Sequence, residues 1–77
     1  MRGIPLTRLR EVRESTIREG KPVSRRQLAE GAGVDYSMLW RLEEGRNGAG
    51  YRIANALARY LGRTVEDIAA PDFAGVA

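Results

Sequence analysis

Two short helices are predicted to follow one another almost directly, joined by a few residues around Gly33. The first helix is expected to begin at Ser24, because Gln27 stands three residues later and each side chain can bond the other's free backbone N–H. Gly33 ends it, since a residue without Cβ adopts a left-handed turn conformation at no steric cost. Asp35 is placed to cap the second helix and Gly45 to end it. A turn this short makes the two helices pack across each other.

The rest of the chain is also predicted to be helical, since no segment alternates in polarity for more than a few residues. One helix is expected over about 5–19, another over about 50–61, and a short one from Thr64 to the residues before Pro71. We therefore predict an all-α fold, a compact domain of five helices. Residues spaced three and four apart form the expected inner faces: Leu6, Leu9, Val12, Thr16 and Ile17 in the first helix, Leu28, Ala29 and Ala32 in the second, and Ile53, Ala54, Leu57, Ala58 and Leu61 in the fourth.

The size and composition favour binding over catalysis. Residues 1–77 make one small domain, with the closely spaced helix pair at about 24–45 and a loose tail at 71–77. There are no cysteines and no histidines. Their absence removes disulfides, thiolate metal sites, the commonest metal ligand and the commonest general base. We therefore expect that the protein is not an enzyme and uses no metal and no cofactor.

The net charge of +3 comes from 13 basic and 10 acidic residues, and Lys21 is the only lysine. Arginine presents a planar fork that suits phosphates and the guanine edge, although a GC-rich genome would produce the same bias. No segment approaches the roughly 20 apolar residues of a membrane span. Residues 1–10 lack the apolar region of a secretion signal, so we expect a cytoplasmic protein.

The stretch RQLAEGAGVDYSMLWRLEEGR, residues 26–46, resembles the helix-turn-helix of phage repressor and Cro-type (XRE-like) DNA-binding domains. The match continues through ALARYLGRTVEDI, residues 56–68, which is similar to the family's fourth and fifth helices. The resemblance covers roughly residues 6–70 and implies a five-helix repressor-like fold that binds double-stranded DNA. The residues in register with the family pattern are Ser24, Leu28, Ala29, Gly33, Val34, Leu39, Leu42, Glu43 and Gly45.

The outer face of the second helix of the pair is the candidate for reading DNA bases. A turn of 100° per residue places Ser37, Arg41 and Glu44 opposite the core, with Trp40 beside them and Tyr36 at the N-terminal end. The resemblance implies that this face enters the major groove. Arg41 is then placed for guanine O6 and N7, and Tyr36 and Ser37 match positions that read base edges in the family. We interpret Trp40 as a further base-reading residue, against a thymine methyl or the sugar-phosphate wall.

Each of these interpretations has a simpler alternative. Arg41 and Ser37 can be solvated surface residues, and Tyr36 can touch only a phosphate. Trp40 can fold over the edge of the core or face a partner protein. Met38 lies at the flank of the buried sector, where filling the core is the favoured interpretation.

The phosphate contacts are expected at helix starts and in the glycine-rich loop after the helix pair. Arg25, at the start of the first helix of the pair, leans toward the second helix and is placed to contact a backbone phosphate, at a position where the family often has glutamine. Arg46 and Asn47 lie in the loop that approaches the DNA backbone in the family. Arg26 points further out and is expected to pair with Glu30, four residues on.

We therefore predict sequence-specific binding of double-stranded DNA by a small transcriptional regulator, a repressor. A homodimer is expected, paired near the fifth helix and the tail through Val65, Phe73 and Val76. No membrane and no small-molecule ligand is expected to be involved. The alternative is a protein-interaction module, such as an antitoxin of this fold, in which Trp40 faces a partner protein.

Overall fold

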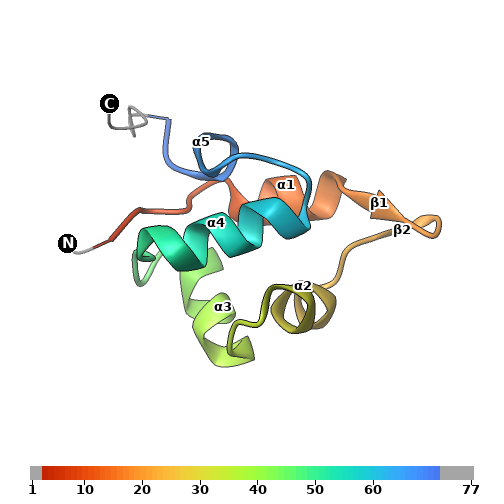
Figure 1. Ribbon diagram of the computed structural model, residues 1–77, viewed down its shortest axis with the longest axis horizontal. Coiled ribbons are helices and arrows are strands. Elements are labelled where there is room, and N and C mark those ends of the chain that lie inside the picture. The colour runs from red at the N-terminus through yellow and green to blue at the C-terminus, as the bar shows by residue number, and fades with distance from the viewer. Residues whose placement is uncertain (1–2, 72–77) are drawn as a thin grey trace.

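The computed structural model describes residues 3–71, which form five helices and one small hairpin (Figure 1). Within these residues no helix is both long and apolar enough to cross a membrane. The five predicted helices are present, but the hairpin makes the fold not strictly all-α. The elements in chain order are α1 (Leu9–Ser15), β1 (Ile17–Arg18), β2 (Lys21–Pro22), α2 (Arg25–Ala32), α3 (Tyr36–Glu43), α4 (Tyr51–Tyr60) and α5 (Val65–Ile68).

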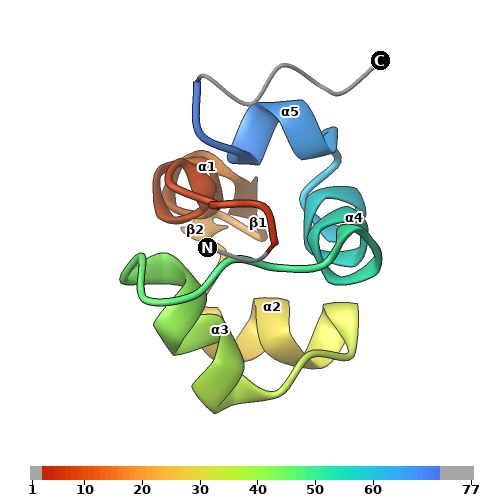
Figure 2. The same ribbon diagram turned by 90° about the vertical axis from the view of Figure 1, so that its left-hand side faces the viewer.

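The helices surround one apolar core. Figure 2 shows α1 and α4 at mid height, with α5 covering them on one side and the α2–α3 pair on the other. Helix α2 packs against both α3 and α4, and α5 packs against both α1 and α4. The core is therefore shared by all five helices rather than formed by the pair alone. Its fully buried large side chains are Leu6, Leu9, Val23, Leu28, Leu39, Leu42, Leu57 and Ile68.

The predicted starts and stops of α2 and α3 are confirmed. The Ser24 hydroxyl accepts from the Gln27 backbone N–H at 3.0 Å, and the Ser24 N–H donates to the Gln27 side chain at 3.3 Å. Gly33 ends α2 with a φ of 72°, in the left-handed region. Asp35 then accepts from the backbone N–H of Met38 at 3.1 Å and begins α3. Local hydrogen-bonding chemistry thus determines the turn between the two helices.

The prediction of one helix over 5–19 is wrong at both ends, because α1 begins only at Leu9 and a β-hairpin takes over after Ser15. Thr16 ends α1 with an extended backbone, and its carbonyl accepts from the N–H of Val23 at 3.0 Å. The turn residues 19–20 both have positive φ, 53° and 80°, as a two-residue hairpin turn of type I′ requires. Ile17, predicted on the inner face, is instead 58% exposed. Because the hairpin reverses the chain, the side chain of Val23 packs into the core instead of that of Ile17.

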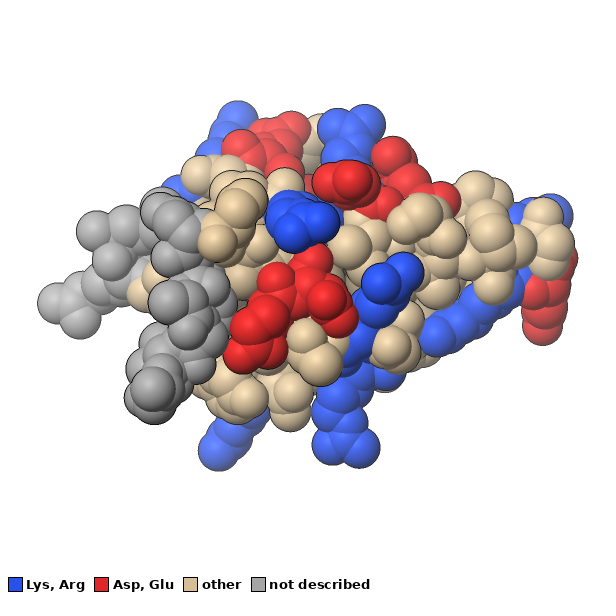
Figure 3. Space-filling model, turned by 90° about the horizontal axis from the view of Figure 1, so that it is seen from above, with Lys and Arg blue, Asp and Glu red and all other residues tan. Residues whose placement is uncertain are grey.

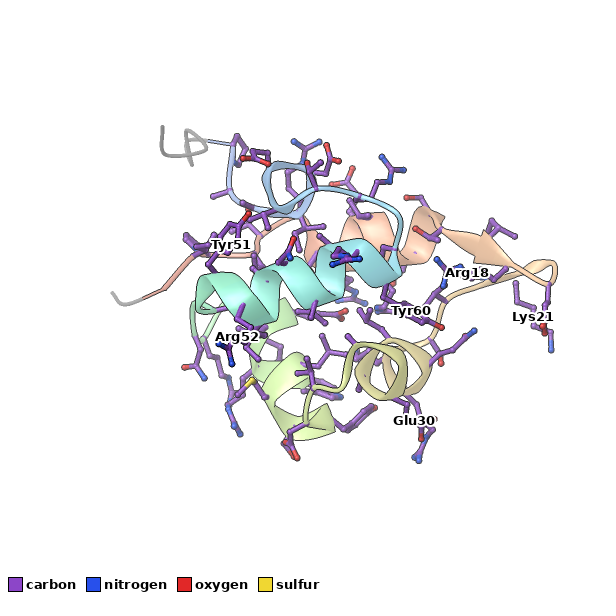
Figure 4. The ribbon with its side chains drawn as sticks, viewed as in Figure 1. Arg18, Lys21, Glu30, Tyr51, Arg52 and Tyr60 are labelled. Carbon is purple, nitrogen blue, oxygen red and sulfur yellow. The ribbon has the colours of Figure 1, made fainter. Side chains whose placement is uncertain are left out.

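The hairpin is fixed to the rest of the fold through Tyr60, at the end of α4. The Tyr60 ring lies so close to Gly31 of α2 that an added Cβ there would come within 2.1 Å of the ring. The guanidinium of Arg18 in β1 lies over the same ring, 4.5 Å from its centroid, and donates to the Tyr60 carbonyl. Figure 4 shows these two side chains together between the hairpin and α4. The hairpin, α2 and α4 therefore meet at one tyrosine.

The apolar residues of α5 are used in the core. Val65 is buried, as is Ile68. The prediction that Val65 belongs to a dimer surface is therefore wrong, because its side chain packs within its own domain. Phe73 and Val76, predicted for the same surface, lie outside the described residues, as does the predicted tail beyond Pro71.

Replacing Ala29 by leucine is expected to destabilise the fold. Ala29 is buried in α2, and its carbonyl accepts from the N–H of Val34 at 2.9 Å, which draws the start of α3 onto α2. A larger side chain must push the two helices apart, at a cost of about 1–3 kcal/mol. Thermal or urea unfolding measures this loss. The matched control is Glu30→Leu, on the exposed side of the same helix, and equal stability of the two variants would contradict the packing described here.

Candidate nucleic-acid interface

The outward face of α3 has the composition predicted from helical geometry. Leu39 and Leu42 are buried, and Met38 is half-buried against the core as predicted. Trp40 is 37% exposed. The predicted base-reading residues and one predicted phosphate contact are brought together around a single shallow hollow, which is lined by Tyr36, Ser37, Trp40, Arg41, Glu44 and Arg46.

A buried carboxylate at the C-terminal end of α3 joins this helix to α1 and α2. The Glu43 side chain is 2% exposed and binds Arg13 of α1 through two contacts, of 2.7 Å and 3.1 Å. Its Oε1 atom also accepts from Nε of Arg25 at 2.9 Å. We call these three residues, Arg13, Arg25 and Glu43, the Glu43 cluster. One carboxylate shared by two guanidinium groups leaves the cluster with a net charge of +1.

Arg13 was not singled out from the sequence, although it belongs to the inner face of α1. Its side chain is 8% exposed, and Nη1 donates to the carbonyl of Val23 at 2.9 Å. Its position in the sequence does indicate that it is buried, because Arg13 stands four residues after Leu9, within the buried stripe of the helix. A charged residue at such a position requires a buried partner, and Glu43 supplies it.

Arginines of α2 lie against aromatic rings of α3. The guanidinium of Arg25 is 4.3 Å from the ring centroid of Trp40, and that of Arg26 is 5.9 Å from the ring of Tyr36. The hydrogen bond with Glu43, with a smaller contribution from Tyr36, raises the pKa of Arg25 above its usual range. The predicted pair between Arg26 and Glu30 is wrong, because no ion pair joins them in the described part of the chain.

The loop after α3 is held by residues from the beginning of the chain. The N–H of Ile4 donates to the carbonyl of Ala49 at 2.7 Å, and the N–H of Ala49 donates back at 2.9 Å. This pairing fixes the end of the loop that carries Arg46 and Asn47, both of which are exposed. Nε of Arg46 lies 3.3 Å from Oε1 of Glu44. In the protein alone, Glu44 therefore partly neutralises Arg46.

The opposite side of the molecule is mixed in charge. Figure 3 shows this side, over α5 and α1, where acidic and basic side chains alternate. The acidic residues of these two helices include Glu11 and Glu14 of α1 and Glu66 and Asp67 of α5. What distinguishes the α2–α3 side is the stacking of arginines on aromatic rings beside an exposed hollow. That side is the stronger candidate for contact with a polyanion.

A comparison with protein families decides what this pair of helices is. The model of the helix-turn-helix domain family matches residues 6–70. The chain belongs to the helix-turn-helix domain family. No significant match was found to a curated protein or to a solved structure.

Within this helix-turn-helix, α2 is the first helix and α3 is the recognition helix, whose outer face meets the major groove in DNA-binding members of this motif. The family assignment supports DNA as the partner of the domain. The exposed hollow lies on the recognition helix and extends to Arg46 in the following loop. The two groups of predicted DNA-contacting residues thus adjoin each other on one side of the helix-turn-helix.

Proposed function

We propose that this helix-turn-helix domain binds double-stranded DNA sequence-specifically, as a small transcriptional regulator of the repressor and Cro type, and that it acts as a repressor in the cytoplasm. The observation that carries the proposal is the hollow on the recognition helix, where Tyr36, Ser37 and Arg41 are exposed together. A face that carries hydrogen-bonding side chains, including an arginine fork, is suited to reading base edges in the major groove.

The roles proposed for individual residues follow from their places on this face. Arg41 donates to O6 and N7 of a guanine, while Ser37 and Tyr36, nearer the N-terminal end of α3, contact the neighbouring base edges. Arg46 and Asn47 contact phosphates on the side of the loop. Such contacts position the domain on the duplex, whereas base contacts determine which sequence it prefers.

We further propose that the domain acts as a homodimer. One recognition helix contacts only a few base pairs, which discriminates poorly against the roughly 10⁶–10⁹ competing sites of a genome. Two-fold symmetry then requires an inverted-repeat operator with half-sites about 34 Å apart. Sedimentation of the free protein and of its complex with DNA measures the oligomeric state.

Replacing Arg41 by alanine is expected to weaken binding by about 1–3 kcal/mol at one base pair of each half-site. The site is first selected from a random pool of duplexes, and affinities are then measured for all its single-base variants. The parent should prefer one base at the base pair that Arg41 contacts. Arg41→Ala should lose this preference and keep the preferences at all other base pairs of the site.

The matched control for Arg41 is Arg63→Ala, which removes the same charge from the connection between α4 and α5. Arg63→Ala should bind every single-base variant of the selected DNA site with the same affinity as the parent protein. If Arg41→Ala weakens all variants equally, Arg41 contacts a phosphate and the assignment of the reading face is wrong.

The second candidate function is a protein-interaction module, such as an antitoxin of this fold. The exposure of Tyr36 and Trp40, two aromatic residues on one helix, favours it. In that case the selection from random duplexes would return no enriched sequence. The stacking of Arg25 on Trp40 supports the DNA proposal instead, because it covers part of the apolar ring with a charged group.

A further inference from the structure

Trp40 lies between the recognition face and the first helix of the motif. Its ring lines the hollow on one side and contacts the guanidinium of Arg25 on the other, at 4.3 Å from the ring centroid. Arg25 in turn donates from Nε to Glu43 at 2.9 Å. The orientation of the Arg25 guanidinium is therefore fixed by two residues of α3, a carboxylate below it and an aromatic ring beside it.

This double contact leaves Arg25 able to bind a second acceptor. A guanidinium has five N–H donors, and the contact with Glu43 uses the one on Nε. The Arg25 side chain is 23% exposed, so its terminal nitrogens lie within reach of the surface between α2 and α3. Because Arg25 shares the Glu43 carboxylate with Arg13, its positive charge is only partly balanced there, and the acceptor that fits its remaining donors is an anion.

We propose that Trp40 is a positioning residue, which holds the guanidinium of Arg25 in place for one DNA phosphate, and that it reads no base. This inference rests on the proposed DNA binding and replaces the base-reading role that the sequence alone suggested for Trp40. A flexible arginine loses side-chain entropy when it binds a phosphate. Stacking on Trp40 reduces that loss, since the guanidinium is already oriented before DNA arrives.

The contact itself can be tested without DNA, because Trp40 is the only tryptophan of the chain. In Arg25→Ala the ring loses its cover, and its fluorescence emission should shift to longer wavelength and become more accessible to a neutral quencher such as acrylamide. Arg26→Ala is the matched control, since Arg26 lies over Tyr36 instead. An emission spectrum and quenching unchanged by Arg25→Ala would overturn the inference at this first step.

The role in binding is tested by a double-mutant cycle on a duplex selected from a random pool. Trp40→Leu should weaken binding about 3–10-fold in the parent, and by the same factor on every single-base variant of the site. In the Arg25→Ala background, Trp40→Leu should have less than about a twofold further effect, because contacting residues that act together are not additive. Trp40→Phe, which keeps an aromatic face, should restore part of the loss.

Two further measurements separate positioning from a structural role. Trp40→Leu and Arg25→Ala should each reduce the dependence of log K on log salt by about 0.9 for each bound protomer, the value for one phosphate, and so by about 1.8 for the proposed dimer. Replacing the contacted phosphate by an uncharged methylphosphonate should abolish the effect of Trp40→Leu. Circular dichroism and urea unfolding verify that the variants are folded, and Trp40→Met, which also removes the aromatic face, serves in place of Trp40→Leu if the leucine variant is not.

The outcomes distinguish this inference from the proposal on which it rests. If the parent selects and binds a duplex but Trp40→Leu alters preference at one base pair, Trp40 reads that base and only this inference fails. It fails equally if the full effect of Trp40→Leu persists in the Arg25→Ala background. If the parent binds no duplex, both proposals fail together.

Discussion

Replacing Glu43 by alanine is expected to lower the free energy of unfolding by about 3–5 kcal/mol, because it leaves two guanidinium groups without their shared carboxylate. The Glu43 side chain is 2% exposed and that of Arg13 is 8% exposed, so the Arg13 guanidinium has little access to water that could replace the lost partner. Small domains are stable by only about 5–15 kcal/mol. Urea unfolding followed by circular dichroism measures the change.

The control for this variant is Glu14→Ala, which also removes a carboxylate near Arg13. The Glu14 side chain is 53% exposed and lies 3.9 Å from Arg13 and 3.3 Å from Arg10. Exposed pairs of this kind contribute about 0–1 kcal/mol. If Glu43→Ala unfolded at the same urea concentration as Glu14→Ala, the Glu43 cluster would not stabilise the fold as described.

The second large effect is expected from salt on DNA binding. With four arginine–phosphate contacts, from Arg25 and Arg46 of each protomer in the proposed dimer, log K should fall with log salt at a slope of about −3.6. Raising salt from about 50 to 200 mM should therefore weaken binding about 150-fold. The cause is the release of counterions from the phosphates that arginines neutralise. Fluorescence anisotropy of a labelled duplex measures the affinity at each salt concentration.

Single arginines should account for part of that slope. Arg46→Ala is expected to weaken binding to all sequences and to reduce the slope by about 0.9 for each bound protomer, or about 1.8 for the proposed dimer. Arg63→Ala, on the connection between α4 and α5, should leave the slope unchanged. An affinity of the parent that does not vary with salt would exclude a phosphate-bound complex and with it the proposed function.

The parts of the fold that depend on local chemistry could be predicted from the sequence. The capping residues Ser24, Gln27 and Asp35 each bond a backbone group three positions away, and the structure confirms all three. The hairpin could not be predicted in this way, because two-residue strands are too short to show a period. Val65 was assigned to the surface because the fifth helix offers too few residues for an apolar stripe to be recognised, and the structure buries it.

The candidate site was predictable as a face but not as a set of contacts. A fixed rotation per residue places Ser37 and Arg41 outward on any α-helix at this position, and the structure agrees. The stacking of Arg25 on Trp40 and the sharing of Glu43 depend instead on how α2 and α3 cross and on where α1 ends. These are tertiary features, and residues that lie 15 or 30 positions apart in the chain give no local sign of them.

The pairing of residues 4 and 49 has a practical consequence for anyone who labels this protein. The segment before α1 and the loop that carries Arg46 and Asn47 are joined by two backbone hydrogen bonds, so a bulky tag attached ahead of residue 3 would pull on the loop. The turn of the hairpin lies at the far end of the long axis from that segment (Figure 1). A dye or surface tether placed at residue 19 would leave the reading helix and its loop undisturbed, and is the better attachment for measurements on single molecules.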